Sequence, residues 1–137
     1  LGPRERTRRW VKRLAPRRKA KVIFYTYPSC TSCRKTKEWL NRHGIPYEER
    51  HIFRDPPSPE ELKEMFRLTT EGTDELLSKR SQAFKSLDID IENLRFTELL
   101  ELLHREPRLL RRPIITYGDH LIVGYDREAL EVLLALA

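Results

Sequence analysis

The sequence predicts an α/β fold in which a domain with one mixed β-sheet is interrupted by an all-helical insert. An apolar and aromatic run, a Cys-x-x-Cys pair, a helical segment and a second extended segment follow one another within residues 22–53. Short amphipathic helical segments fill residues 54–108, and a hairpin signal with a closing helix follows in 109–137. We therefore expect 22–53 and 109–137 to form one domain around the 54–108 insert.

The first part of this domain has the order strand, helix, strand. β-Branched and aromatic residues favour a strand over 22–27, which Pro28 ends. The helix is expected over 31–43, with Gly44 as its C-terminal cap, and a second strand over 45–52. A helical crossover makes two such strands parallel neighbours. A strand, a Cys-x-x-Cys turn, a helix and a strand in this order are typical of a thioredoxin-like fold.

The insert is expected to contain several short helices with buried leucines. Ser58-Pro59-Glu60-Glu61 is a capping box with proline at the first helical position, so a helix should begin there. Thr73 is expected to cap the next short helix, and a further one is expected over 81–87. The last helix of the insert should begin at Thr97, and its leucines are expected to be core residues.

The closing part is expected to supply a hairpin and the final helix. Residues 109–117 read as a loop that leads into a third strand, and Gly118-Asp119 is a hairpin turn signal. The returning strand is expected over 120–123, with Asp126 as the N-cap of the last helix. Three leucines of this helix are expected to pack on the sheet: Leu130, Leu133 and Leu134.

The positive charge is concentrated at the beginning of the chain. The formal net charge is +6 over 137 residues, whereas residues 1–21, with ten Lys or Arg and one Glu, carry +9. Residues 22–137 therefore carry −3, so their charge does not argue for DNA binding by the folded part. We expect 1–21 to be a basic appendage. Trp10, Val11 and Leu14 could share one side of a helix that touches phosphate, a membrane surface or an acidic partner, and a solvated tail is the alternative.

The cysteine pair is the motif that carries chemistry. Cys30 is expected at a helix N-terminus, where free N–H groups and the helix dipole favour a thiolate, and Arg34 and Lys35 add positive charge. Cys33 is close enough in sequence to form a small, reversible disulfide. The alternatives are half of a zinc site and two inert cysteines. A zinc site needs two more ligands and the four histidines are scattered, so we expect no metal and no cofactor.

No apolar run approaches the length of a membrane-spanning helix, and no signal-peptide core is present in the sequence. We therefore expect a cytoplasmic protein without a membrane partner. In that compartment a Cys-x-x-Cys pair is more readily explained as redox-active than as a structural disulfide.

Three segments, in order, resemble the Spx family of Gram-positive redox regulators, which lies within the superfamily of glutaredoxin-like arsenate reductases (ArsC-like proteins). They are Cys30-Thr-Ser-Cys-Arg-Lys35, Thr70-Glu-Gly-Thr-Asp-Glu75 and Leu109-Leu-Arg-Arg-Pro-Ile114. The sequence around the cysteines, from Tyr27 to Lys37, is most similar to the MgsR branch of this family. The resemblance extends from residue 22 to about residue 131, and three spaced motifs are far more specific than Cys-x-x-Cys alone.

The resemblance implies a regulator that binds the C-terminal domain of the RNA polymerase α subunit and redirects transcription under stress. Gly72 matches the glycine required at that interface, where the absence of a side chain lets the partner approach closely. Arg67, about one helical turn upstream, is expected to join the same surface. Residues 1–21 have no counterpart in typical family members and would contact promoter DNA beside the α subunit.

The resemblance also assigns the redox residues. Cys30 and Cys33 match the disulfide switch, Arg112 matches an arginine that senses its oxidation state, and Pro113 matches the proline that thioredoxin-like folds place beside the active site. Family members end in a longer tail that presents a signal to the ClpXP protease. The end of this chain, 133–137, is short and apolar, so recognition by ClpXP is implied only through the resemblance.

An enzyme is the competing interpretation, because an activated cysteine on this fold also serves an arsenate reductase or a thiol oxidoreductase. Arsenate reduction requires several arginines that converge on one cysteine, and the candidates are Arg34, Arg80, Arg111 and Arg112. The second cysteine and the segment 71–74 favour the regulator, so we expect no catalytic residues. A nucleic-acid-binding protein that acts through residues 1–21 is a third interpretation.

Overall fold

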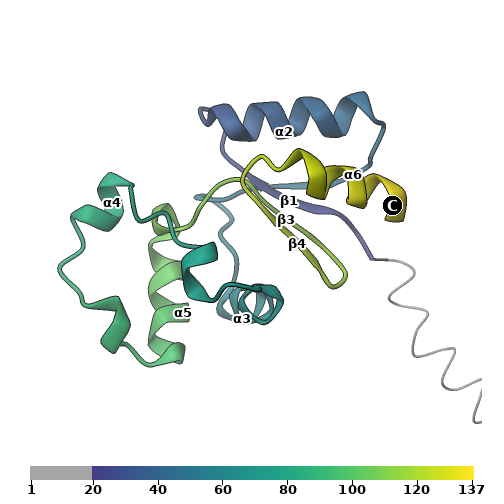
Figure 1. Cartoon of the computed structure of the whole chain (residues 1–137). Helices are drawn as coiled ribbons and strands as arrows, with labels where there is room; N and C mark the ends of the chain where they lie inside the picture. The colour runs from purple at the N-terminus through teal and green to yellow at the C-terminus, as the bar shows by residue number, and fades with distance from the viewer. Residues whose placement is uncertain (1–19) are drawn as a thin grey trace, which may run out of the picture.

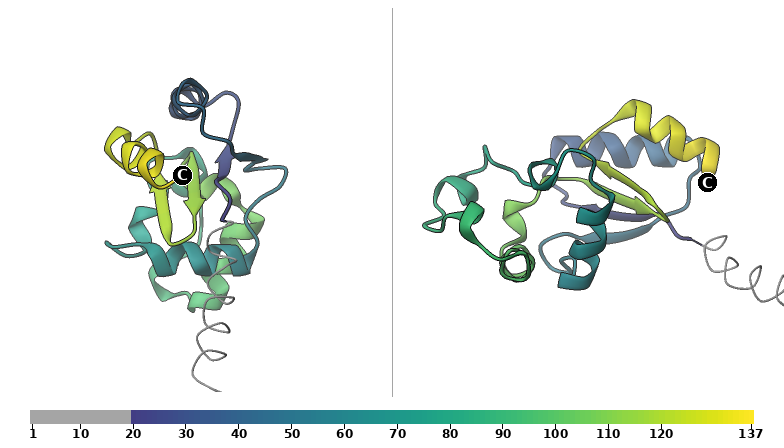
Figure 2. Two further views of the ribbon diagram at one scale, coloured as in Figure 1. Left: turned by 90° about the vertical axis from the view of Figure 1, so that its right-hand side faces the viewer. Right: turned by 60° about the horizontal axis from the view of Figure 1, so that its bottom comes forward.

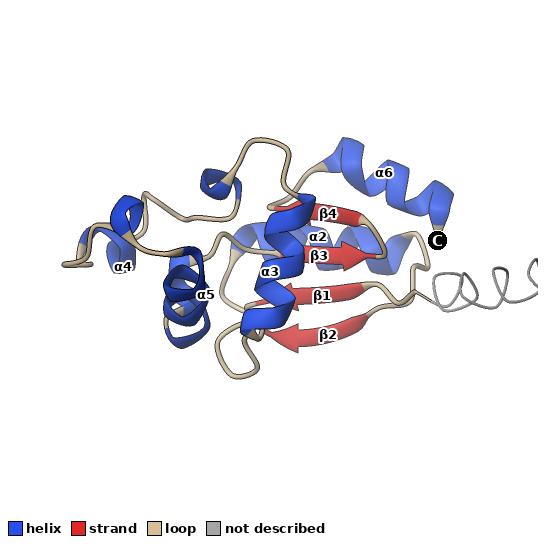
Figure 3. Ribbon diagram, turned by 90° about the horizontal axis from the view of Figure 1, so that it is seen from below, coloured by secondary structure: helices blue, strands red, loops and turns tan. Residues whose placement is uncertain are grey.

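The computed structural model describes residues 20–137, so the predicted appendage lies outside the described residues except for Ala20 and Lys21. A four-stranded sheet has the order β2-β1-β3-β4. Its strands are β1 (Ile23–Thr26), β2 (Glu48–His51), β3 (Ile114–Tyr117) and β4 (His120–Val123). β1 and β2 are parallel, and β3 is antiparallel to both β1 and β4. The predicted mixed sheet, its parallel pair and its hairpin are confirmed (Figure 3).

Two helices cover one face of the sheet, α2 (Thr31–Arg42) and α6 (Arg127–Leu136) (Figure 1). Gly44 follows α2 with a φ of +66°, which fits the predicted glycine cap. Asp126 caps α6 as predicted, because its Oδ1 accepts the N–H of Ala129 at 3.1 Å. The buried residues between helices and sheet are Val22, Phe24, Trp39, Leu40, Ile45, Ile115, Ile122, Leu130 and Leu133.

The prediction for Leu134 was wrong. Leu130 and Leu133 of α6 are buried on the sheet, but Leu134 is 38% exposed. Each helical residue is rotated by about 100° from the one before it, so Leu134 is carried away from the face on which Leu133 lies.

The opposite face of the sheet is covered by α3 (Pro59–Leu68), with α5 (Phe96–Arg105) packed beside it (Figure 2). Successive residues of β1 serve the two faces, because Phe24 belongs to the core under α2 while Tyr25 belongs to the core under α3. The second core includes Tyr25, Ile52, Leu62, Met65, Phe66, Leu99, Leu103 and Ile114. This core contains residues of both the sheet and the insert, and the division of the chain into a redox domain and an insert domain at 54–108 remains a prediction.

The short helices of the insert are η1 (Thr73–Glu75), α4 (Gln82–Lys85), η2 (Ile91–Asn93) and η3 (Pro107–Leu109), where η denotes a 3₁₀ helix. The capping box at the start of α3 is confirmed by reciprocal hydrogen bonds between Ser58 and Glu61. Thr73 was wrongly predicted as a cap, because Gly72 occupies the cap position and Thr73 is the first residue of η1. α5 begins at Phe96, one residue before the predicted start.

Candidate functional site

The Cys-x-x-Cys pair lies where β1 leads into α2. Cys30 is the N-cap residue of α2, and its backbone N–H donates to the carbonyl oxygen of Tyr27 at 3.1 Å. Its Sγ accepts a hydrogen bond from the backbone N–H of Cys33 at 3.3 Å, in the way that a serine oxygen does at other helix N-termini. Within the described helix α2, the first turn contains no acidic residue. The sulfur of Cys30 therefore lies against a helix N-terminus, where the sequence predicted it.

The two cysteines differ in exposure. Cys30 is half-buried, whereas Cys33 is only 1% exposed, and both are free thiols. Burial, together with the hydrogen bond to Cys30, raises the pKa of Cys33 to about 11, although hydrogen bonds with Tyr27 and Thr26 act in the opposite direction. Cys33 is therefore protonated at neutral pH. This arrangement fits a pair in which Cys30 reacts first and Cys33 resolves the product into a disulfide.

Pro113 lies at the same end of the sheet as the cysteine turn. Ile114, the first residue of β3, pairs with Tyr25 near the end of antiparallel β1. The residue before Ile114 is therefore beside the end of β1 that leads to Cys30. Pro113 is buried, and the Arg112–Pro113 peptide bond is cis. Pro113 therefore lies near the cysteine turn, and its part in redox sensing remains a prediction.

Arg112 makes no hydrogen bond with Cys30 within residues 20–137, and other residues link it to the cysteine turn. Its guanidinium carbon is 5.3 Å from the centre of the Phe53 ring, and its Nη1 donates to the carbonyl oxygens of Leu110 (3.2 Å) and Arg108 (3.4 Å). The ring of Phe53 packs on that of Tyr27, with 4.7 Å between centroids. The backbone carbonyl oxygen of Tyr27 accepts the N–H of Cys30. Arg112 is therefore linked to the cysteine turn through the rings of Phe53 and Tyr27 and then the Tyr27 backbone. The sequence expectation of an arginine near Cys30 did not include these rings.

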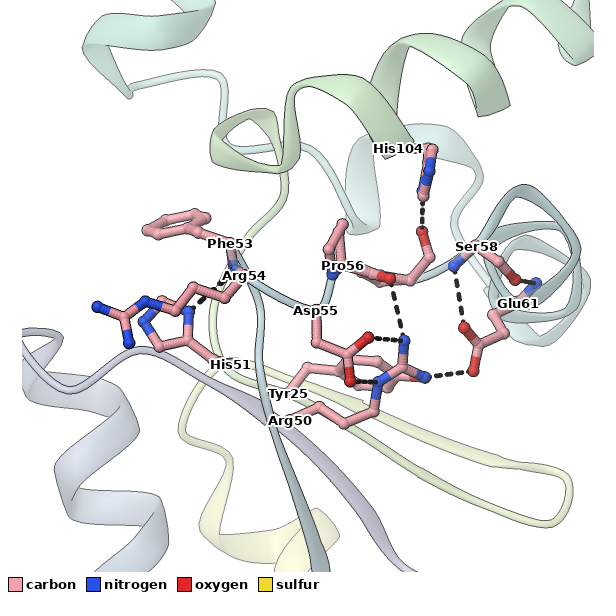
Figure 4. A network of polar contacts seen from close by, with 11 residues as sticks. Tyr25, Arg50, His51, Phe53, Arg54, Asp55, Pro56, Ser58, Glu61 and His104 are labelled. Carbon is pink, nitrogen blue, oxygen red and sulfur yellow. Dashed lines mark hydrogen bonds and ion pairs between the residues drawn. The ribbon is translucent and has the colours of Figure 1, made fainter.

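The position of Phe53 is fixed by His51 at the end of β2. The Nδ1 atom of His51 accepts the backbone N–H groups of Phe53 and Arg54, each at 3.2 Å (Figure 4). The ring of His51 also makes an edge contact with Tyr27 at a centroid distance of 5.6 Å. The sequence signal for this turn is a histidine at the end of a predicted strand, a position from which its side chain can accept the N–H groups that follow.

The four arginines proposed for an anion pocket do not converge on Cys30. Arg34 and Arg80 are exposed, and Arg111 donates to the carbonyl oxygen of Glu75 at 3.3 Å. Across residues 20–137, none of the four guanidinium groups forms a hydrogen bond with either cysteine. The Nε of Arg112 is buried and has no hydrogen-bond partner within this described part of the chain. The geometry in this state is therefore not that of a preformed oxyanion site.

Gly72 and Arg67 border one depression on the insert, which has a volume of about 580 Å³. Seven other residues line it: Glu60, Lys63, Glu64, Phe66, Thr69, Thr73 and Phe96. The rings of Phe66 and Phe96 meet edge to face at 5.7 Å. The structure thus brings the two predicted interface residues to one surface. The aromatic residues between them were not identified from the sequence, because their helical spacing also suits a core.

Gly72 has a backbone conformation that other residues avoid. Its φ is +91° and its ψ is −164°, a region populated almost entirely by glycine. A Cβ built on Gly72 would meet no atom within 4 Å. Arg67 is exposed and forms ion pairs with Glu64 and with Asp119, the latter at 3.3 Å. Gly72 is thus required by its backbone conformation even before any partner is considered.

A polar network ties β2 to the start of the insert. The side chain of Arg50 is only 15% exposed, and all five of its N–H donors are used. Nε and Nη2 donate to the carboxylate of Asp55, Nη2 also donates to the carbonyl oxygen of Pro56, and Nη1 donates to Tyr25 and Glu61 (Figure 4). All four residues of β2 are polar and the first two are exposed, so the sequence carries no local signal that Arg50 is largely buried.

Glu61 holds the other end of this network. Its Oε2 accepts from Arg50 and from the Tyr25 hydroxyl, and its Oε1 accepts the backbone N–H of Ser58 at 2.9 Å. Burial alone would raise the pKa of Glu61, but the hydrogen bonds from Arg50 and Ser58 outweigh it and lower the pKa from its ordinary value. Burial also raises the pKa of Tyr25, so its hydroxyl keeps its proton and donates to Glu61.

Two further properties of the described chain bear on the site. Within residues 20–137, no three His, Cys, Asp or Glu side chains gather into a set that could hold a metal ion. Over the same range, no helix combines the length and the apolar composition that spanning a membrane requires.

Comparison with known proteins gives several relatives. The model of the ArsC family matches residues 25–133. The regulatory protein MgsR of Bacillus subtilis is 55% identical over 105 residues, covering 77% of this chain and 83% of the relative. The global transcriptional regulator Spx of Listeria monocytogenes is 50% identical over 107 residues, covering 78% of this chain and 82% of the relative.

Solved structures with the same fold carry lower identities. A crystal structure of an ArsC-family-related protein from Bacteroides fragilis has a TM-score of 0.74 and 30% identity, covering 82% of this chain and 97% of that one. An arsenate reductase from Vibrio cholerae has a TM-score of 0.71 and 25% identity, covering 83% and 96%. These similarities confirm the predicted thioredoxin-like fold of the ArsC type.

The family model spans most of the chain, and the named regulators are 50–55% identical over more than three quarters of it. This chain therefore belongs to the ArsC family, on the branch that contains Spx and MgsR.

Proposed function

We propose that this protein is a transcriptional regulator whose cysteine pair, Cys30 and Cys33, controls its binding to the C-terminal domain of the RNA polymerase α subunit under stress. Relatives at 50–55% identity are named regulatory proteins, which supports a role in transcription. The observation that carries the thiol switch is the 3.3 Å hydrogen bond from the N–H of buried Cys33 to the Sγ of half-buried Cys30.

The chemistry of the switch is a two-electron oxidation. The Cys30 thiolate attacks an oxygen of a hydroperoxide, forms a sulfenic acid and releases water or an alcohol. The Cys33 sulfur then attacks the Cys30 sulfur, the S–S bond forms and water leaves. Overall, two thiols lose two protons and two electrons to the hydroperoxide. Burial favours the protonated form of Cys33, so direct attack by an outside reagent should fall mainly on Cys30.

The proposed polymerase surface is the depression bordered by Gly72 and Arg67. It combines two edge-to-face phenylalanine rings with a charged rim, which suits a protein partner that contributes both apolar and polar groups. We propose that the regulator acts in the cytoplasm and has two further partners. The basic residues 1–21 would contact promoter DNA, and the resemblance implies recognition by the ClpXP protease.

The enzyme alternative rests on the fold shared with the Vibrio cholerae arsenate reductase. It would require the arginines to converge on Cys30. In this state the guanidinium of Arg112 is bound by two carbonyl oxygens and the Phe53 ring instead. Arsenate-dependent oxidation of the reduced chain, followed by turnover with added thiol, would favour the enzyme.

The test of the proposed function is binding of the whole chain to the isolated C-terminal domain of the α subunit. Gly72→Arg should abolish binding, but it adds both bulk and backbone strain. Thr73→Arg adds bulk at the same depression on a helical residue, and it should weaken binding at least tenfold. Gln82→Arg, on the exposed face of α4 outside the depression, is the matched control and should bind as the wild type does. Retained binding by both Gly72→Arg and Thr73→Arg would refute the proposed surface.

A further inference from the structure

The loop that carries Gly72 is closed by a single carboxylate. The Oε2 atom of Glu75 accepts the backbone N–H groups of Thr70 at 2.9 Å and Glu71 at 3.2 Å. The backbone N–H of Glu75 donates to the carbonyl oxygen of Gly72 at 3.3 Å. Hydrogen bonds from backbone N–H groups to an ionised carboxylate are stronger than those between neutral groups. The carboxylate of Glu75 thus binds the chain before Gly72, and the backbone N–H of Glu75 binds Gly72 itself. Together these hydrogen bonds hold the unusual backbone conformation of Gly72.

The segment that follows Glu75 is bound to the chain before Pro113. Leu76 accepts the backbone N–H of Arg111 at 2.9 Å, and Ser78 donates to the carbonyl oxygen of Leu109 at 2.7 Å. These bonds flank an antiparallel bridge between two buried leucines, Leu77 and Leu110. The Nη1 of Arg111 donates to the carbonyl oxygen of Glu75 at 3.3 Å. Arg111 thus binds two consecutive residues: its backbone N–H donates to Leu76, and its guanidinium donates to Glu75, the residue that closes the Gly72 loop.

Arg111 also lies next to the redox-sensing segment. Arg112 follows it directly and rests on Phe53, which packs against Tyr27 beside Cys30. The Arg111 guanidinium passes close to Gly124, where an added Cβ would come within 3.3 Å of Nη2. A displacement of residues 111–113 must therefore move the hydrogen bonds that Arg111 makes to the segment 75–76.

We propose that Glu75 is the positioning residue of the Gly72 surface and that Arg111 couples it to the oxidation state of the cysteine pair. This inference rests on the proposed function, because it explains how a disulfide at one end of the sheet changes a binding surface on the insert. Formation of the disulfide alters the turn under Tyr27 and shifts Arg112 on Phe53. The hydrogen bond from Arg111 to the carbonyl oxygen of Glu75 then changes in length, and Glu75 moves with it. This movement changes the hydrogen bonds that the Glu75 carboxylate accepts from the backbone N–H groups of Thr70 and Glu71.

The first test uses the whole chain without a partner. Amide signals and hydrogen exchange of Thr70 and Glu71 are compared by NMR in the reduced and oxidised forms. We expect Glu75→Ala to speed exchange of both amides about tenfold or more in the reduced form, and Arg111→Met to remove the change that oxidation causes in them. Glu71→Ala is the control, because it removes a neighbouring carboxylate that does not close the loop. It should leave the exchange rate of the Thr70 amide unchanged.

The second test measures affinity for the C-terminal domain of the α subunit. Glu75→Ala should weaken binding about tenfold while leaving the melting temperature close to that of Glu71→Ala. Glu75→Gln, whose amide oxygen still accepts hydrogen bonds, should recover part of the affinity. A merely structural role would lower the melting temperature of Glu75→Ala without separating its affinity from that of the control.

The outcomes separate the two proposals. If the wild type binds and Glu75→Ala binds equally well, the inference is overturned while the proposed function stands. If the wild type does not bind in either oxidation state, the proposed function fails and the NMR comparison decides the inference alone. Identical Thr70 and Glu71 signals in the reduced and oxidised wild type would then overturn it.

Discussion

The backbone N–H of Cys33 points at the Sγ of Cys30 across 3.3 Å, so the two cysteines share one helix N-terminus but not one environment. Cys30 caps α2 and is reached by solvent, whereas Cys33 is buried against the end of β1. This difference in exposure assigns the two cysteines different roles, and it leads to predictions that can be checked on the purified chain.

Alkylation should discriminate between the two cysteines. We expect iodoacetamide to modify Cys30 of the folded, reduced chain at neutral pH at least tenfold faster than Cys33, because Cys33 is buried and protonated. Mass spectrometry of the peptides that contain each cysteine measures this ratio. In denaturant the two rates should become similar. Equal rates in the folded chain would show that Cys33 is accessible, contrary to this assignment.

Stability of the reduced chain should fall at alkaline pH because of Cys33. Its pKa rises from an ordinary value of 9.0 to about 11 on folding, so the unfolded state loses this proton first. The free energy of unfolding should therefore decrease between pH 9 and pH 11, and remain unaffected by this group below pH 9. The measurement is denaturant unfolding across this range for wild type and Cys33→Ser. Since serine does not titrate there, the variant should show a smaller decrease, and equal slopes would contradict the prediction.

Gly72→Ala should be more destabilising than Gly44→Ala, although both glycines are exposed and have no neighbour within 4 Å of an added Cβ. Gly72 has a φ of +91° and a ψ of −164°, a region that costs a residue with a Cβ on the order of 1–3 kcal/mol. Gly44, with a φ of +66°, has the φ of the left-handed helical region, where alanine should cost about 1 kcal/mol. Thermal and denaturant unfolding compare the two variants. A smaller loss for Gly72→Ala would mean that its backbone relaxes freely.

Arg50→Met should destabilise the fold by about 2 to 3 kcal/mol, because it leaves the partly buried Glu61 and Tyr25 without their shared donor. Arg42→Met is the matched control. It removes an arginine from an exposed pair with Glu38 and should cost less than about 0.5 kcal/mol. Denaturant unfolding at neutral pH measures both. Similar losses for the two variants would show that the network at β2 contributes no more than a surface ion pair.

Most of the fold could be predicted because its signals are local. The Cys-x-x-Cys turn, the capping box at Ser58 and the hairpin at Gly118 each depend on a few adjacent residues, and each appears where it was expected. The side-chain assignments that failed depend on orientation. Leu134 is one residue beyond the buried face of α6, and Thr73 lost the cap position to Gly72, whose backbone conformation only glycine adopts readily.

The candidate site was less predictable, because its parts meet only through tertiary packing. Sequence motifs indicated Arg112 and Cys30, but not that Phe53 and Tyr27 lie between them. The Gly72 motif likewise did not reveal that Glu75 closes the loop through two backbone N–H groups. Contacts of this kind join residues whose individual types are ordinary, so composition and spacing carry no signal for them.

The most direct test of the account is the affinity of the whole chain for the isolated C-terminal domain of the RNA polymerase α subunit, measured by calorimetry in the fully reduced and the fully oxidised state. We expect binding that Thr73→Arg weakens and Gln82→Arg does not, and an affinity that differs at least tenfold between the two oxidation states. Cys33→Ser, which cannot form the disulfide, should bind identically under both conditions. Binding by the wild type that is unchanged by oxidation would contradict the thiol switch, and absence of binding in both states would contradict the regulator itself.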